Sequence, residues 1–162
     1  MRRLALLLAL LPGAAGACPM TLALYSDTAT GAELRFRAAQ PWEQVGMTKH
    51  VMDLALPDGR VLWGSVTENM GTSRDTGHLF SGCPRPGPED APLDEAQTEA
   101  CEVWSGVVYA LQDGAVTLLP YGSDKAPESL ILTDVGRQLR YEIMDSPGDE
   151  PWDQFRLSGC AE

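Results

Sequence analysis

Residues suited to catalysis gather in one polar stretch of this sequence, residues 68–78. Ser73, Asp75 and His78 have the side chains of a nucleophile, an orienting acid and a general base. These three residue types often occur this close together without a catalytic role, and the sequence contains no G-x-S-x-G nucleophile turn. We therefore predict no catalytic residue and a non-enzymatic protein. A hydrolase that uses His78 as its base is an alternative.

The same stretch is better suited to recognition. Loops held by a rigid β scaffold commonly carry binding residues, and several side chains here provide hydrogen-bond donors. The sequence predicts ligand contacts from five residues of this stretch: Asn69, Ser73, Arg74, Asp75 and His78. A solvated connection held by Asx and Ser/Thr turns is the alternative.

Few residues of the chain are suited to binding a metal. There are two histidines, and a tetrahedral zinc site lacks ligands once the cysteines are used in disulfides. Met47, His50 and Met52 together suit Cu(I), so a periplasmic Cu(I) carrier is another alternative. Methionine is also an ordinary core residue, and His50 and Met52 share their predicted strand face with leucines. We therefore predict no metal and no cofactor.

The four tryptophans provide a different kind of binding surface, a platform on which a ligand can stack. Trp63 and Trp104 fall within patterned segments, which predicts that they lie in the core. Trp42 and Trp152 each follow a proline in a predicted loop, so the sequence does not assign them to the core.

The N-terminus carries an export signal. A basic pair, Arg2 and Arg3, precedes an apolar run over 4–11, and small residues follow as far as Ala17. This order is typical of a secretory signal peptide with its cleavage site. We predict a signal peptide over residues 1–17 and a periplasmic or secreted protein.

The mature chain, residues 18–162, has the length of one domain, and we predict a single β domain. The whole sequence has a formal net charge of −11, and the two arginines of the signal peptide bring the mature chain to −13. This charge predicts no nucleic-acid partner. It permits an inhibitor or sequestering partner of a cationic protein such as lysozyme. No apolar segment is long enough to anchor the chain, so we predict no stable membrane insertion.

The mature chain contains four cysteines, an even number that predicts two disulfides in an exported protein. Among the possible pairings we favour Cys18–Cys160, which joins the chain ends, and Cys83–Cys101, which brackets a proline-rich segment. Loop-closure entropy gives the short link about 3 kcal/mol and the long link somewhat over 4 kcal/mol. Lipidation of Cys18 is the alternative, although the residues before it lack the leucine of a lipoprotein signal.

Alternation of apolar and polar residues predicts short strands along most of the mature chain. In the clearest one, Leu34 and Phe36 face one side and charged residues face the other. Turn sequences such as Pro57-Asp58-Gly59 join neighbouring strands into hairpins. About nine strands are predicted, over residues 20–25, 32–38, 50–56, 60–67, 107–111, 115–119, 129–133, 138–144 and 154–158.

One helix is predicted to begin at Asp94, where Gln97 completes a capping box. Apolar residues fall at helical spacing as far as Trp104, and Gly106 ends the helix. About nine short strands with one short helix and two disulfides predict a mainly β protein, an antiparallel β-sandwich or barrel. We predict that this scaffold belongs to an exported periplasmic binding or interaction protein, whose partner is an unknown small ligand or protein.

Overall fold

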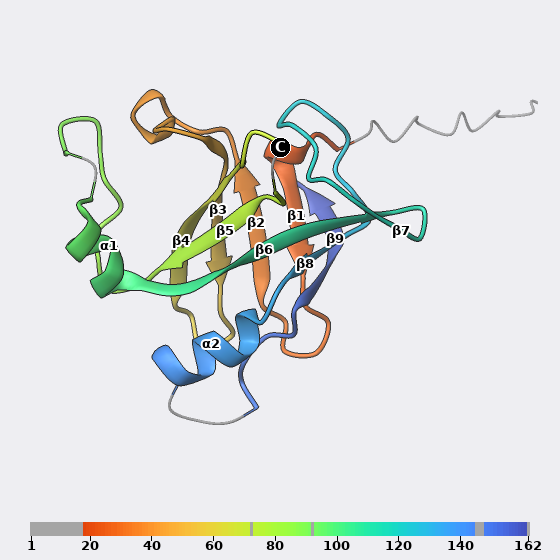
Figure 1. The fold of residues 1–162 in the computed structure, drawn as a ribbon. Coiled ribbons are helices and arrows are strands. Elements are labelled where there is room, and N and C mark those ends of the chain that lie inside the picture. The colour runs from red at the N-terminus through yellow and green to blue at the C-terminus, as the bar shows by residue number, and fades with distance from the viewer. Residues whose placement is uncertain (1–17, 72, 92, 145–147, 162) are drawn as a thin grey trace, which may run out of the picture.

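The structure, a computed structural model, describes residues 18–71, 73–91, 93–144 and 148–161. The predicted signal peptide, residues 1–17, lies outside the described residues. Within the described chain there are nine β-strands and two α-helices (Figure 1). The strands are β1 (Ala23–Ser26), β2 (Glu33–Arg37), β3 (Thr48–Ala55), β4 (Val61–Thr67), β5 (Thr76–Phe80), β6 (Glu102–Gln112), β7 (Ala115–Thr117), β8 (Ser129–Leu132) and β9 (Gln154–Cys160). The helices are α1 (Glu95–Cys101) and α2 (Val135–Glu142), and two 3-10 turns are η1 (Met20–Leu22) and η2 (Pro41–Glu43).

Eight of these strands close into an antiparallel barrel. The order around it is β1-β2-β3-β4-β5-β6-β8-β9, and β9 pairs with β1 to complete the ring. The short strand β7 pairs with the end of β6 beside the ring (Figure 1). The predicted mainly β fold with two disulfides is therefore confirmed, and its form is a closed barrel rather than a sandwich.

The ring closes through β6, which pairs with different neighbours along its length. Its first half pairs with β5, and its second half pairs with β8. Ser105 lies in the first half, where β6 has β5 on one side and no strand of the described chain on the other. On that open side the side-chain amide of Gln138 in α2 takes the place of a strand. It accepts from the Ser105 N–H and donates to the Ser105 carbonyl, both at 3.1 Å. The docking of α2 therefore completes the hydrogen bonding of β6.

Side chains fill the inside of the barrel. Trp104 and Phe155 are among the largest fully buried side chains. Trp104 needs glycines beside it, because a Cβ at Gly77 would lie 2.7 Å from its ring and one at Gly106 would lie 2.9 Å from it. The Trp104 indole N–H donates to the Thr133 carbonyl at 3.0 Å. An eight-stranded barrel has an interior just wide enough for such side chains. The outer surface of the barrel is therefore where concave binding sites are expected.

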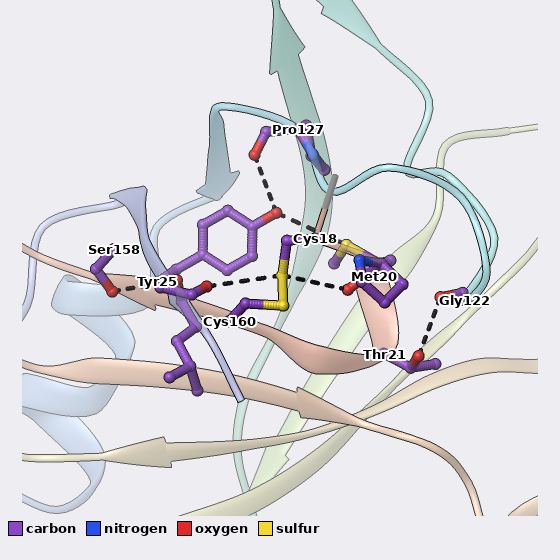
Figure 2. Close-up of a disulfide and its surroundings, with 11 residues drawn as sticks. Cys18, Met20, Thr21, Tyr25, Gly122, Pro127, Ser158 and Cys160 are labelled. Carbon is purple, nitrogen blue, oxygen red and sulfur yellow. Dashed lines mark hydrogen bonds between the residues drawn. A yellow bond between two sulfur atoms is a disulfide. The ribbon is translucent and has the colours of Figure 1, made fainter. Parts of the chain in front are cut away.

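One end of the barrel is held by the Cys18–Cys160 disulfide (Figure 2). The Cα atoms of the two cysteines lie 5.7 Å apart, and the bond ties the start of the described chain to β9. Beside it, the buried Tyr25 hydroxyl donates to the Pro127 carbonyl at 3.1 Å. Because the Cys18 sulfur is bonded to Cys160, it is not free to carry a lipid.

The second disulfide, Cys83–Cys101, closes a loop over the outer face of β3, β4 and β5, with a Cα–Cα distance of 5.8 Å. Both predicted pairings are confirmed. The indole N–H of Trp63 on β4 donates to the Cys83 carbonyl at 2.9 Å, which fastens the loop to the sheet. Val51 and Phe80 on this outer face are buried.

Some predictions of local structure are wrong. Residues 138–144, predicted as a strand, lie mostly in α2, because Val135 and Leu139 stand one helical turn apart and both bury against the barrel. The predicted helix has its capping box at Asp94 but ends at Cys101. The residues after Cys101 continue as β6, in which Trp104 faces the barrel interior.

Removing the Cys18–Cys160 disulfide should cost more stability than removing Cys83–Cys101. The first links residues 142 positions apart and the second links residues 18 positions apart. Loop-closure entropy gives upper losses of somewhat over 4 and about 3 kcal/mol. Urea unfolding of the Cys18→Ala/Cys160→Ala and Cys83→Ala/Cys101→Ala proteins measures both losses. Equal losses, or the reverse order, would contradict this expectation.

Candidate functional site

A pocket of about 230 Å³ lies on the outer face of the barrel, between strands β3 to β5 and the disulfide loop. We call it the outer pocket. Its lining combines aromatic and charged side chains, of which the important ones are Trp42, Trp63, Phe80, Glu43, Arg85 and Asp90. Concave sites with an apolar lining and a few placed polar groups are the usual sites for small ligands.

Aromatic rings form the main wall of the outer pocket. Trp63 and Phe80 come from neighbouring strands and stack with ring centres 4.4 Å apart and planes at 26°. Trp42 faces the same pocket and keeps 39% of its surface exposed. Stacked and exposed ring faces of this kind offer a flat apolar ligand a specific contact.

Paired charges line the pocket beside these rings. The Arg85 guanidinium bonds the Asp53 carboxylate and lies 5.8 Å from the Trp63 ring centre. Glu43, whose side chain is only 9% exposed, accepts hydrogen bonds from Arg37 at 2.7 and 2.5 Å. The Arg37 contact lowers the pKa of Glu43 below its ordinary value, so this carboxylate is ionised at neutral pH.

Local turn chemistry positions the two loops that border the pocket. Pro41 starts the 3-10 turn η2, and Glu43 also accepts from the backbone N–H of Gln40 at 2.8 Å, which completes a capping box. On the other side, the Asp90 carboxylate accepts from the Gly87 N–H at 2.7 Å. Trp42 and Asp90 are therefore presented from fixed turns.

The predicted recognition loop is shorter than expected, because Thr76 already belongs to β5. The Asn69 side-chain amide donates to the Arg74 carbonyl at 2.5 Å and to the Thr76 hydroxyl at 3.3 Å. Ser73 and Arg74 are exposed. The structure thus brings Asn69 and Arg74 together within the loop.

Asp75 points away from this loop and into the molecule. Its carboxylate lies 3.0 Å from the Lys49 ammonium, and both side chains are at least nine-tenths buried. The ammonium also donates to the Leu119 carbonyl at 2.6 Å and lies 4.7 Å from the Tyr121 ring centre. The pair therefore joins β3 to the segment that follows β7.

His78 stands on the outer face of β5, where its ring lies parallel to that of Phe80 with centres 6.4 Å apart. Its Nδ1 is 2.6 Å from the Glu102 carboxylate and 3.4 Å from the Ser105 hydroxyl. A nucleophile relay needs the serine and the acid on opposite ring nitrogens, whereas here both meet Nδ1. The sequence did not identify Glu102 and Ser105 as neighbours of His78, because both fall within the segment predicted as a helix.

The three candidate copper ligands differ in their surroundings. Met47 lies at the surface, whereas His50 and Met52 are buried inside the barrel. The His50 Nε2–H donates to the Pro120 carbonyl at 2.7 Å. Burial lowers the pKa of His50 from 6.5 to about 4, so its ring is neutral at pH 7. Across the described residues, no three or more His, Cys, Asp or Glu side chains are grouped as metal ligands.

No protein-family model, curated protein or solved structure matches this chain. Neither helix in the described part of the chain has the length and apolar character needed to cross a membrane. The two disulfides are compatible with an extracellular location.

The tryptophans are the sequence signal that leads to the outer pocket. Trp104 is in the core, as predicted, and Trp152 is exposed. Trp63, predicted in the core, lies instead on the outer face of β4, because its neighbour Leu62 takes the inward position. Trp42 and Trp63 line one pocket, but their proximity depends on the sheet register and on the disulfide loop.

The buried Lys49–Asp75 pair gives a stability prediction. Asp75→Leu leaves a buried ammonium without its carboxylate, and Lys49→Met leaves the carboxylate alone. Each should destabilise the protein by about 3–5 kcal/mol, whereas the double variant should lose much less. Urea unfolding of the three variants tests this. A double variant as unstable as the sum of the single variants would show that the pair is not coupled.

Acid should weaken the fold through His50. The unfolded chain takes up a proton near pH 6.5, but the folded protein resists protonation of His50 until about pH 4. Stability is therefore full above about pH 6.5 and falls by up to about 3 kcal/mol as the pH drops to 4. Urea unfolding across this range measures the slope. In His50→Gln, which does not titrate, the slope should be shallower, and an unchanged slope would refute the assignment.

Proposed function

We propose that this chain is an exported, non-enzymatic binding protein whose outer pocket holds a small ligand with a flat apolar body. The observation that carries the proposal is the aromatic wall of Trp63 and Phe80 with Trp42 facing the same space. A pocket of about 230 Å³ is smaller than the roughly 300–1,000 Å³ of drug-sized sites, so we expect a ligand of one or two rings.

Binding is favoured over catalysis by the surroundings of the pocket. The nearest histidine, His78, holds both its acid and its serine neighbour on one ring nitrogen. Glu43 and Arg85 are paired with Arg37 and Asp53, and Asp90 accepts from a backbone N–H, so these groups orient a ligand rather than exchange protons with it. Export is supported by the predicted signal peptide and by the two disulfides, which suit an oxidising compartment.

The charges of the pocket favour a ligand with a positive end. Its lining contributes the carboxylates of Glu43 and Asp90 against the single guanidinium of Arg85. Asp53 pairs with that guanidinium and Arg37 pairs with Glu43, so the Asp90 carboxylate remains as a surplus negative charge. An ammonium group beside aromatic faces gains a further cation–π attraction. We therefore expect a small aromatic amine to bind better than the corresponding acid.

The test uses ¹⁵N-labelled mature protein and three two-ring probes: indole, tryptamine and indole-3-acetate. Their binding is followed through the indole N–H signals, assigned with single Trp→Phe variants. We expect the signals of Trp42 and Trp63 to shift and tryptamine to bind most tightly. Trp42→Ala should weaken tryptamine binding at least tenfold, about 1.4 kcal/mol, because a stacking face is lost.

Two matched variants sharpen this experiment. Trp152→Ala removes another exposed tryptophan outside the outer pocket and should leave the affinity unchanged. Asp90→Asn keeps the acceptor for the Gly87 N–H and should reduce the preference for tryptamine over indole. The proposal fails if no probe shifts the Trp42 or Trp63 signal at millimolar concentration, or if Trp42→Ala and Trp152→Ala weaken binding equally.

A further inference from the structure

Trp152 is an exposed side chain on a fixed backbone. The residue is 70% exposed, while its backbone N–H donates to the Asp27 carboxylate at 3.3 Å. The preceding Pro151 is buried against α2, where a Cβ at Gly136 would lie 2.1 Å from the Pro151 carbonyl oxygen. The peptide unit between Pro151 and Trp152 is therefore held by contacts at both its carbonyl oxygen and its N–H group. We call these two contacts the clamp.

On the Asp27 side of this clamp, the carboxylate accepts several hydrogen bonds. Asp27 is 2% exposed and also accepts from the Ala29 N–H at 3.0 Å and the Thr30 hydroxyl at 2.7 Å. Burial alone would raise its pKa, but these hydrogen bonds and that from Trp152 lower the pKa of Asp27 below its ordinary value. The Asp27 carboxylate is therefore ionised at neutral pH, and it keeps its hydrogen bond from the Trp152 N–H.

Two hollows meet at Trp152, at the end of the barrel where α2 and the β1–β2 turn lie (Figure 1). One has a volume of about 450 Å³ and extends toward Tyr141 of α2, whereas the other, of about 520 Å³, extends toward Leu111 and Arg156. They share Ala29, Trp152 and Asp153 in their linings. We call the two hollows together the Trp152 groove.

The rim of the Trp152 groove is polar, and two of the three arginines in its lining are paired with carboxylates. Arg137 donates to Asp134 at 2.8 and 2.9 Å, and Arg140 lies 3.4 Å from Glu150. A second aromatic ring, that of Tyr141, is 75% exposed at the edge of the first hollow. These groups offer many hydrogen-bond donors and acceptors with no surplus of positive charge.

We propose that the Trp152 groove binds a carbohydrate chain, with one sugar ring on the Trp152 indole and its neighbours in the two hollows. Sugar rings have an apolar C–H face that suits an exposed indole, and a rim of hydroxyls that suits paired carboxylates and guanidiniums. The four carboxylates of the lining outnumber its three arginines, which disfavours phosphate ligands. A groove hollowed on both sides of a rigid anchor fits a chain of rings better than a flat protein surface. This site is separate from the outer pocket and does not depend on its ligand.

The experiment titrates ¹⁵N-labelled mature protein with maltohexaose, cellohexaose and chitotetraose. At least one should shift the Trp152 indole N–H signal and leave that of Trp42 in place. Trp152→Ala should reduce the affinity at least tenfold, and Trp152→Phe should reduce it less, because Phe keeps an aromatic face. Trp42→Ala is the matched control and should bind the same oligosaccharide with unchanged affinity.

Three outcomes overturn the proposal: none of the three oligosaccharides binds, Trp152→Ala binds as tightly as the unmodified protein, or Trp42→Ala weakens binding equally. If the oligosaccharides fail and a protein partner is lost in Trp152→Ala, the exposed indole is a protein-contact residue instead. The indole exposure makes a folding defect in Trp152→Ala unexpected, and its urea unfolding curve checks this. Failure here leaves the outer-pocket proposal standing, since Trp42 and Trp152 line different sites.

Discussion

Closure of the barrel through β6 is the constraint on which the rest of the structure depends. One strand joins β5 to β8, so the sheet has no open edge at this position. Its inward side chain, Trp104, occupies space that only glycine at Gly77 and Gly106 leaves free. At Ser105, where no strand of the described chain pairs with β6 on the side away from β5, the Gln138 amide supplies the hydrogen bonds and thereby fixes α2 against the ring. The position of the helix at one end of the barrel follows from this need.

The filled interior of the barrel leaves no room for a ligand inside the ring. A ligand of the kind we propose would instead be held where loops or helices build against the outer wall or an end of the barrel. The chain does this twice. The Cys83–Cys101 loop and η2 build the outer pocket over β3 to β5, and α2 with the β1–β2 turn builds the Trp152 groove. In both places the supporting backbone is fixed by carboxylates that accept backbone N–H groups, Glu43 and Asp27 among them.

The sequence predicts those parts of the fold that local patterns determine. Alternation marks β2, where Leu34 and Phe36 are buried as predicted, and the even cysteine count leads to both disulfide pairings. The sequence does not predict the strand Thr76–Phe80, because glycine is unfavourable within strands. The need for Gly77, which leaves room for the Trp104 ring, is visible only in the structure. Residues 138–144 alternate like a strand, yet burial of Leu139 one turn after Val135 makes a helix the better arrangement. The outer pocket depends on strand register, so its members were visible only as separate tryptophans.

The acidic character of the chain and the paired charges at the outer pocket and the Trp152 groove act on different length scales. A formal net charge of −11 repels anions at long range, but salt screens that field beyond about 8 Å under physiological conditions. At these two sites, Arg37 with Glu43 and Arg140 with Glu150 form local pairs. Such pairs contribute little to stability when they are exposed, but they fix the directions of donors and acceptors. For the ligands we propose, selection at short range would therefore depend on how their rings and polar groups match the indole faces and these oriented pairs.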